Sequence, residues 1–325
     1  MNSRFSSLDG WRGIAILFVL AGHLLPLGPK VWEMNAAIAT TGMVIFFNLS
    51  GFLITNILLR DQNVMPFLIR RLMRIVPLAW LVLCVTLFGI AAKWELYLPH
   101  LFFYANWEPM AVSGPTSHFW SLCVEMQFYF AIAALVLIFK KKAFYILPLL
   151  CVAITLYRWH NNVGIAINTY YRVDEILAGC ILSLLYNGSK EFVRRFFCSL
   201  NPIIMFLLLL VSAHPLGGFF MYLRPYISMI MIGSTLFNEQ VSWLGRLLKS
   251  RFLFYIASIS YALYVIHGGL RYTWLAEGDT MVRYLKRPLF FVTTFLLAHI
   301  STFYYEKKWI DFGKKITAHF VSPTK

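Results

Sequence analysis

Residues 38–59 read IATTGMVIFFNLSGFLITNILL, a run of 22 residues without a charged side chain. Other apolar runs, most of them 15 to 24 residues long, recur along the 325-residue chain. A bilayer core of about 30 Å requires about 20 apolar residues for each helical crossing. With 59% hydrophobic and 13% charged residues, the composition exceeds what a water-soluble globule of this size can bury. The sequence therefore predicts an integral membrane protein.

Continuous apolar runs favour helices over a transmembrane barrel, whose strands alternate apolar and polar residues over about ten positions. We expect an all-α, polytopic helical bundle that forms a single integral-membrane domain over residues 1–325 without an appended soluble domain. The chain length and the flanking charges indicate about ten transmembrane helices. The expected spans are 13–27, 38–59, 75–92, 119–139, 143–157, 173–186, 201–213, 220–237, 252–275 and 288–305.

The charge balance is strongly basic, with 29 Lys and Arg against 14 Asp and Glu. In a soluble protein this excess would suggest a nucleic-acid partner, but in a polytopic protein basic residues accumulate in cytoplasmic loops. If both termini are cytoplasmic, 20 of the 29 basic residues, from Arg4 to Lys325, lie on the cytoplasmic side. We therefore predict cytoplasmic termini, contact with membrane lipids and no nucleic-acid partner.

Five cysteines are distributed along the chain, mostly inside apolar runs. Their odd number argues against a disulfide framework. None forms a close metal-binding spacing with another Cys or His, so we expect small core residues and no metal site. The five positions are Cys84, Cys123, Cys151, Cys180 and Cys198.

The first span carries two polar side chains on one helix face. Eleven positions separate Arg12 from His23, which places His23 nearly above Arg12 and about 16 Å along the helix. Ionisable groups at membrane depth are costly and commonly functional, and an imidazole is suited to proton transfer near neutral pH. Arg12 could instead reach the headgroups, and His23 could be a hydrogen-bonded structural residue.

A carboxylate lies at a similar expected depth in the fourth span. Glu125 follows about two helical turns after the outer end of that span, and His23 lies in the outer half of its own. A carboxylate that met the imidazole would orient the ring and keep it basic. An ordinary hydrogen bond between helices is the alternative for Glu125.

Arg70, Arg71 and Arg74 immediately precede the apolar part of the third span. Arg71 and Arg74 are one helical turn apart and can point the same way. Arginine forks match phosphate oxygens, and this end of the span would face the cytoplasm. A basic patch that holds anionic lipid is the competing interpretation.

Six stretches, taken together and in order, resemble membrane-bound acyltransferase family 3. The resemblance extends over essentially the whole chain, and its first, third and fourth stretches are the most specific. The six stretches are Leu8–Ala15 (LDGWRGIA) followed by His23, Phe46–Leu53 (FFNLSGFL), Arg70–Pro77 (RRLMRIVP), Phe119–Tyr129 (FWSLCVEMQFY), Arg172–Glu175 with Ala178–Gly179, and Ile259–His267 (ISYALYVIH).

The resemblance implies an enzyme that moves an acyl group, usually acetyl, from coenzyme A to a hydroxyl of an envelope saccharide. Such an enzyme would be an acyltransferase of the bacterial inner (plasma) membrane, with acetyl-CoA as donor and no metal. The family's Arg-x10-His pattern falls on Arg12 and His23, its Arg-x-x-Arg donor-binding pair on Arg71 and Arg74, and its carboxylate on Glu125. We accordingly expect His23 and Glu125 to be catalytic and the three arginines to bind the donor. For the acceptor, we expect contacts with Trp120, Ser121, Asp174, Tyr261 and His267.

Some positions depart from the family pattern. Trp11 replaces the usual Leu before Arg12, and residues 306–308 (EKK) lack the proline of a common Glu-x-Pro motif. Many glycan-modifying relatives also carry a C-terminal extracytoplasmic domain, which we do not expect in this protein. We therefore expect the acceptor, such as O-antigen, exopolysaccharide or a lipid-linked saccharide, to reach the membrane domain directly or through a separate extracytoplasmic partner.

Two choices remain open at the level of sequence. His23 could activate the acceptor hydroxyl directly or be acylated itself in a covalent relay. The main alternative function is a transporter or flippase of a saccharide or lipid-linked intermediate, because many carriers also place polar groups inside a helical bundle. The apolar runs show no matched pair of broken spans, which disfavours this alternative. A noncatalytic membrane scaffold or receptor is a third possibility.

Overall fold

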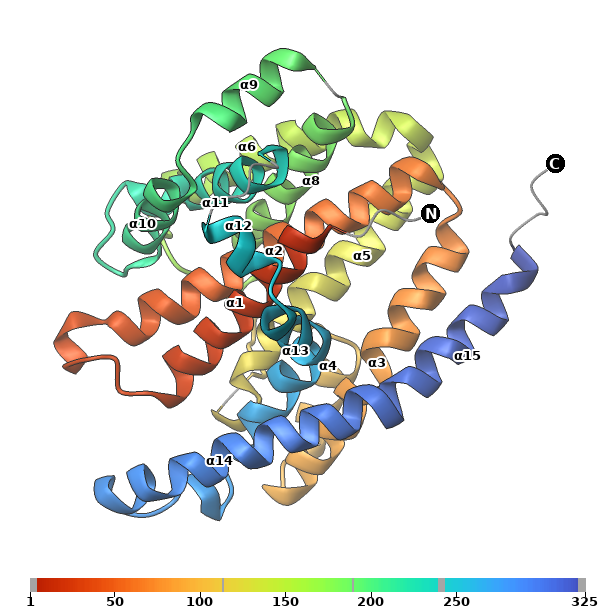
Figure 1. Cartoon of the computed structure of the whole chain (residues 1–325). Coiled ribbons are helices and arrows are strands. Elements are labelled where there is room, and N and C mark those ends of the chain that lie inside the picture. Colours follow the sequence, from red (N-terminus) through yellow and green to blue (C-terminus); the bar gives the residue numbers. More distant parts are fainter. Residues whose placement is uncertain (1–4, 113, 189, 239–242, 321–325) are drawn as a thin grey trace. The chain divides into compact units, whose positions relative to one another are not determined.

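The computed structural model describes residues 5–112, 114–188, 190–238 and 243–320, and this part of the chain is helical without β-strands (Figure 1). Arg4 and Lys325, which the charge argument counted, lie outside it. The predicted all-α class is thereby confirmed. The α-helices are α1 (Ser6–Leu24), α2 (Met34–Arg60), α3 (Val64–Gly89), α4 (Tyr97–Leu101), α5 (Trp120–Phe139), α6 (Ala143–His160), α7 (Thr169–Arg172), α8 (Asp174–Asn187), α9 (Glu191–Ser199), α10 (Pro202–Ala213), α11 (Phe220–Phe237), α12 (Trp243–Leu248), α13 (Arg251–Leu270), α14 (Thr280–Ile300) and α15 (Lys307–Thr317).

Shorter helical turns connect these elements. Most are 3-10 turns, and η6 is a π-helix that continues α14 into α15. The set comprises η1 (Lys30–Trp32), η2 (Trp94–Leu96), η3 (Gly114–Phe119), η4 (Lys140–Lys142), η5 (Trp274–Ala276), η6 (Ser301–Glu306) and η7 (Ala318–Phe320).

Each of the ten expected spans overlaps one of these helices, but fewer satisfy the length and apolarity that a crossing requires. Five helical segments do so in the described residues, and a sixth results if α9 and α10, bent by 74°, form one span. Helices α8 and α10 have 14 and 12 residues, below the roughly 20 that a straight crossing needs. The polytopic helical architecture is confirmed, whereas the number of ten crossings stays a prediction. The five segments are Met34–Arg60, Val64–Gly89, Gly114–His160, Arg251–Leu270 and Thr280–Thr317.

Two compact units divide the chain. Unit 1 comprises Met1–Asp61 and Phe139–Ser258, and unit 2 comprises Gln62–Ile138 and Ile259–Lys325. The predicted single domain over residues 1–325 stays a prediction.

The five cysteines differ in burial. Cys123, Cys151 and Cys180 are buried, as predicted for small core residues. Cys84 and Cys198 are exposed, so the prediction was wrong for these two positions. Cys84 lies on α3, where an apolar exposed side chain can face lipid as readily as protein, and apolarity alone therefore did not identify its environment.

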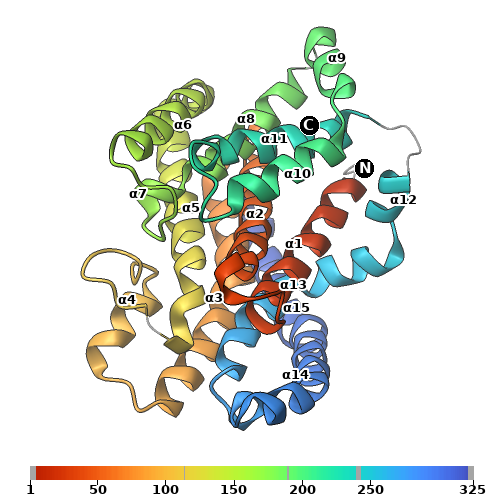
Figure 2. The same cartoon turned by 90° about the vertical axis from the view of Figure 1, so that its left-hand side faces the viewer.

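In unit 1, α2 packs against both α1 and α8 (Figures 1 and 2). Two glycines allow the backbones of α2 and α8 to touch. A Cβ atom added at Gly51 would lie 1.9 Å from the Ile176 carbonyl oxygen, and one added at Gly179 would lie 1.9 Å from the Asn48 carbonyl oxygen. Small residues at a helix crossing are typical of membrane proteins, because close backbone approach supplies the packing that lipid cannot.

Replacing Gly179 by Ala is expected to lower the free energy of unfolding by about 1–3 kcal/mol, because the new methyl group meets backbone that cannot rotate away. The measurement is reversible unfolding of the purified protein in mixed micelles. Gly89→Ala is the matched control, since no atom lies within 4 Å of a Cβ at that position. Equal stability of the two variants would contradict the backbone contact.

In unit 2, α14, η6 and α15 form one helical run, and α15 packs along α3 (Figure 1). Gly313 of α15 faces Met73, whose side-chain carbons would lie 3.0–3.1 Å from an added Cβ. The Arg70 Nε donates a hydrogen bond of 2.7 Å to the Thr317 Oγ1. These contacts hold the first half of α3, which contains the predicted donor-binding arginines.

Candidate active site

Arg71 and Arg74 lie one turn apart on α3, and both side chains are half-buried. The guanidinium carbon of Arg71 lies 5.9 Å from the centre of the Tyr129 ring on α5. Arg74 and Glu125 interact electrostatically with Arg71. The two arginines are therefore close to the carboxylate that the sequence selected as catalytic.

Glu125 and Tyr129 are separated by one helical turn on α5, and the Tyr129 hydroxyl donates a hydrogen bond to the Glu125 Oε1. Tyr129 is buried, and its ring also packs edge-on against Phe67 at 6.2 Å. This tyrosine fixes the carboxylate and offers an aromatic face to Arg71. Tyr129 was within the family-like stretch but was not selected from the sequence.

Tyr261 and Glu306 lie near Arg74 in unit 2. The Tyr261 hydroxyl donates to the Ile75 carbonyl at 2.5 Å, next to Arg74 in the chain. Glu306 is buried at the end of η6 and accepts hydrogen bonds from Ser301 at 3.2 Å and Thr302 at 3.0 Å. Arg74 is its cationic neighbour, and Tyr261 is near both.

These six residues, Arg71, Arg74, Glu125, Tyr129, Tyr261 and Glu306, are called the arginine cluster below. Two carboxylates balance its two guanidinium groups. Each guanidinium carries five N–H donors, so an arginine oriented by one carboxylate retains donors for a further anion. The cluster can thus balance the charge of its arginines and still offer their N–H donors to a phosphate.

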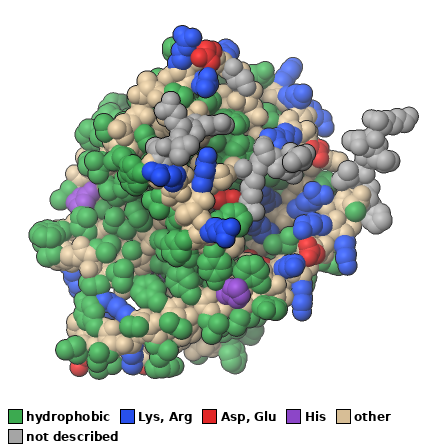
Figure 3. Space-filling view, viewed as in Figure 1, with side chains coloured by type: hydrophobic (Ala, Val, Ile, Leu, Met, Phe, Trp, Pro, Cys, Tyr) green, Lys and Arg blue, Asp and Glu red, His purple; other side chains and the backbone are tan. Residues whose placement is uncertain are grey.

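The surface beside the arginine cluster is basic. Arg70 is exposed at the start of α3, and four exposed lysines lie on α15. Figure 3 shows blue side chains gathered over α15. Such a surface raises the local concentration of anionic ligands. The lysines are Lys307, Lys308, Lys314 and Lys315.

A second polar group in unit 2 contains the predicted acceptor-binding residues Ser121 and His267. The Tyr264 hydroxyl donates to the His118 carbonyl oxygen and lies 2.5 Å from the Ser121 Oγ. The His118 and His267 rings have centres 5.1 Å apart, and the His267 Nδ1 lies 2.6 Å from the Tyr264 carbonyl oxygen. All four side chains are buried, and the adjacent Trp120 is half-buried. Roles in acceptor binding stay predictions.

Arg12 and His23 occur in unit 1, in the second turn and the last turn of α1, and both are half-buried. The Arg12 Nη1 lies 4.0 Å from the Asp9 Oδ1. The neighbouring Trp11 donates from Nε1 to the Thr235 Oγ1 at 2.9 Å, which fixes the rotation of α1. Because His23 belongs to unit 1 and Glu125 to unit 2, their pairing stays a prediction.

Asp174 and Glu175 begin α8 inside a buried ion-pair network. The Arg158 Nη1 lies 2.6 Å from the Asp174 Oδ2, and both side chains are at most 1% exposed. Glu175 pairs with the Nε of Arg224 at 2.9 Å and with the Nε of Arg172 at 3.2 Å. Asp174 therefore has a structural partner, and its predicted contact with the acceptor stays a prediction. Sequence reasoning missed Arg158 and Arg224, although each interrupts an otherwise apolar helix.

Comparison with known proteins identifies the relatives of this chain. A Staphylococcus aureus protein named as a candidate O-acetyltransferase is 27% identical over 80% of this chain and 49% of its own length. Bacillus subtilis YrhL, named as a candidate peptidoglycan O-acetyltransferase, is 26% identical over 98% of this chain and 57% of its own length. O-acetyltransferase OatA of Staphylococcus aureus is 25% identical over 80% of this chain and 49% of its own length.

The chain spans about half the length of these curated relatives. No significantly similar solved structure was found. The family model described as the acyltransferase domain matches residues 5–306, which is nearly the whole chain. This protein therefore belongs to acyltransferase family 3, the family that its sequence motifs resemble.

Proposed function

We propose that this protein is a membrane O-acetyltransferase that transfers an acetyl group from acetyl-CoA to a hydroxyl group of a cell-envelope saccharide. The arginine cluster carries this proposal, because Arg71 and Arg74 lie together on one side of α3 and retain N–H donors that can bind the phosphates of the donor. Membership in the acyltransferase family and the names of the O-acetyltransferase relatives agree with the proposed chemistry.

The donor phosphates bind Arg71 and Arg74 in this proposal, with Arg12 as a further contact. The exposed lysines of α15 guide the donor to the arginine pair. Because acyl-CoA is made in the cytosol, this arrangement requires the start of α3 to face the cytoplasm, in agreement with the predicted orientation in the plasma membrane. Glu125 and Glu306 keep the guanidinium groups oriented before the donor arrives.

His23 acts as the general base. Its imidazole accepts the proton of the acceptor hydroxyl, whose oxygen then bonds to the acyl carbon as the carbon–sulfur bond of the thioester breaks. The proton passes from His23 to the departing thiolate, so the products are the acetyl ester and free coenzyme A. Glu125 orients the imidazole. In the alternative scheme His23 is itself acylated for a short time, and kinetic trapping of this acyl-enzyme would distinguish the two schemes.

The proposed acceptor is a saccharide, either free or linked to lipid. O-antigen and exopolysaccharide are the acceptors expected from the family, and the name of the Bacillus subtilis relative adds peptidoglycan as a third class. Mass spectrometry of envelope glycans from cells with and without the protein tests this point. An acetyl group that replaces a hydroxyl hydrogen adds about 42 daltons. The expected result is that one class of glycan loses this added mass in cells without the protein.

Replacing Arg71 or Arg74 by Gln is expected to raise the KM for acetyl-CoA by about 10- to 100-fold, because a charge-assisted hydrogen bond to phosphate is lost. Steady-state kinetics at saturating acceptor measures the change. Arg74→Lys keeps the charge next to Glu306 and should recover part of the affinity.

Arg195→Gln is the matched control for these variants, because Arg195 is an exposed arginine of α9 that pairs with Glu191 and has no proposed part in donor binding. We expect its KM to remain within about twofold of the wild-type value. A wild-type KM for acetyl-CoA in folded Arg71 and Arg74 variants would exclude the proposed donor contacts.

A further inference from the structure

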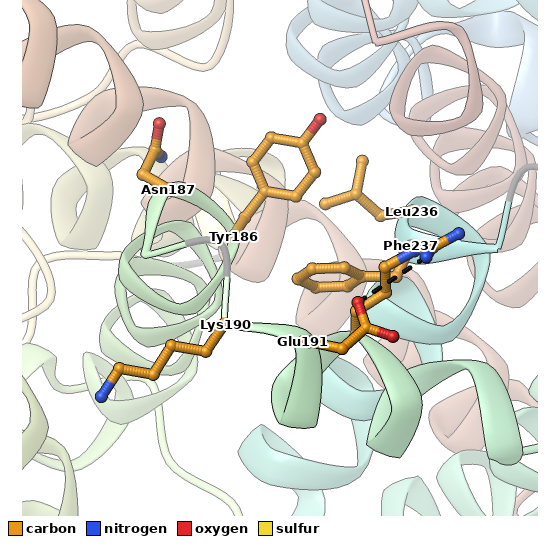
Figure 4. Close-up of a pocket in the computed structure, with 7 residues that line it drawn as sticks. Tyr186, Asn187, Lys190, Glu191, Leu236 and Phe237 are labelled. Atoms are coloured by element: carbon orange, nitrogen blue, oxygen red, sulfur yellow. Dashed lines mark ion pairs between the residues drawn. The ribbon is translucent and has the colours of Figure 1, made fainter.

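A pocket in unit 1 lies between the ends of α8 and α11 and the first turn of α9. Its volume is about 460 Å³, and Tyr186, Lys190, Arg194 and Phe237 are among its lining residues. Figure 4 shows the Tyr186 and Phe237 rings near Leu236, whereas the Lys190 side chain extends away from these rings. The pocket thus combines an aromatic wall with flexible cationic side chains.

The charges around this pocket are predominantly positive. Glu191 lies 3.8 Å from the Arg194 Nη1 and 3.1 Å from the Arg195 Nε, so one carboxylate is shared by two arginines. Lys190 adds a third cation at the start of α9. Of these groups, Lys190, Arg194 and Glu191 line the pocket, and their net charge of +1 favours an anion there.

Helix α9 is amphipathic. One part of its apolar face packs against the protein, and the rest is exposed. Phe197 is buried against Gly233, where an added Cβ would lie 2.3 Å from its ring. Phe192 and Phe196, on the same apolar face, are 80% and 45% exposed. Helix α9 is therefore anchored to unit 1 by one phenylalanine and presents two others outward.

The direction of α9 suits a membrane interface. Its axis is bent by 74° from that of α10, which coincides with the seventh expected span. If α10 runs across the bilayer, α9 runs nearly parallel to the membrane plane. An amphipathic helix in that position inserts its aromatic residues into the acyl boundary and keeps its arginines among the headgroups.

We propose that this pocket binds the phosphate of an anionic phospholipid headgroup, with α9 lying in the interface of the same leaflet. Lys190 and Arg194 bind the phosphate oxygens, and the rings of Tyr186 and Phe237 contact the glycerol portion. Phe192 and Phe196 place the pocket at the depth where a lipid phosphate is found, which favours this source over a soluble phosphate. The positive-inside argument assigns this end of α8 to the cytoplasmic leaflet, where anionic lipids attract basic segments.

The test uses the full-length protein in nonionic detergent, titrated with short-chain phosphatidylglycerol while its Tm is recorded. Binding of the lipid to the folded state raises the Tm. In the double variant Lys190→Gln/Arg194→Gln, the apparent affinity for phosphatidylglycerol should fall roughly 30-fold, about fivefold for each lost cation. Lys141→Gln/Lys142→Gln is the matched control, because it removes the same charge from the exposed η4 turn and should leave the affinity unchanged.

Parallel titrations identify the source of the phosphate. Phosphatidylcholine and inorganic phosphate should give no Tm change that depends on Lys190 and Arg194. The proposal is overturned if the double variant binds phosphatidylglycerol as tightly as the wild type. It is also overturned if the two substitutions weaken stabilisation by coenzyme A or inorganic phosphate instead. Single Lys190→Gln, with an expected fivefold loss, replaces the double variant if the latter does not fold.

Discussion

His23→Ala is expected to keep the fold and to lower kcat for acetyl transfer by about 10²- to 10⁴-fold, the usual contribution of a general base. The side chain lies in the last turn of α1 and is half-buried, so its removal leaves the buried face of that helix intact. The KM for acetyl-CoA should change little, because the proposed phosphate contacts are made by arginines elsewhere. The measurement is acetyl transfer in purified membranes, normalised to folded protein.

His299→Ala is the matched control for His23→Ala. His299 lies near the end of α14 and packs against Phe303 with ring centres 4.7 Å apart, and it has no proposed part in the chemistry. We expect nearly wild-type turnover from this variant. Full activity of folded His23→Ala, or equal losses in both variants, would rule out His23 as the base.

Glu175→Gln is expected to lower the free energy of unfolding by about 3–5 kcal/mol, because it leaves Arg224 and Arg172 buried without their carboxylate. The Glu175 and Arg224 side chains are both 0% exposed, so water cannot compensate for the lost charge. Reversible unfolding in mixed micelles measures the difference. Since Gln preserves the shape of the side chain, the loss reports charge and not packing.

A double-mutant cycle measures the interaction energy of the Glu175–Arg224 ion pair. Glu175→Gln combined with Arg224→Gln should cost less than the sum of the single changes, because one uncompensated charge is removed together with its partner. Glu191→Gln, which removes a carboxylate from the exposed pairs of α9, should have only a small effect. Additive single and double effects would argue against a direct Glu175–Arg224 pair.

The helices were readable from the sequence because long apolar runs have few other ways to satisfy their backbone polar groups in lipid. The expected spans 143–157 and 220–237 correspond closely to α6 and α11. The beginning of α1 was placed too late, at residue 13, because Asp9 and Arg12 interrupt the apolar pattern although the helix begins at Ser6. Apolarity alone also could not separate a full crossing from a helix of only 12 residues such as α10.

The arginine cluster was only partly predictable. The one-turn spacing of Arg71 and Arg74 is a local pattern, and Glu125 was conspicuous inside an apolar helix. Tyr129 and Glu306 acquire their roles through contacts between α3, α5 and η6, which no short stretch of sequence encodes. The same reason explains why Arg158 was missed: its partner Asp174 is on another helix.

The π-helix η6 has a consequence for the register of the C-terminal helical run. A π turn accommodates one residue more than an α turn, so everything downstream is rotated by about 100° relative to an uninterrupted helix. Deletion of a single amino acid between Ser301 and Glu306 would turn Gly313 away from Met73 and bring a bulkier neighbour against α3. The extra residue therefore determines which face of α15 carries its four exposed lysines.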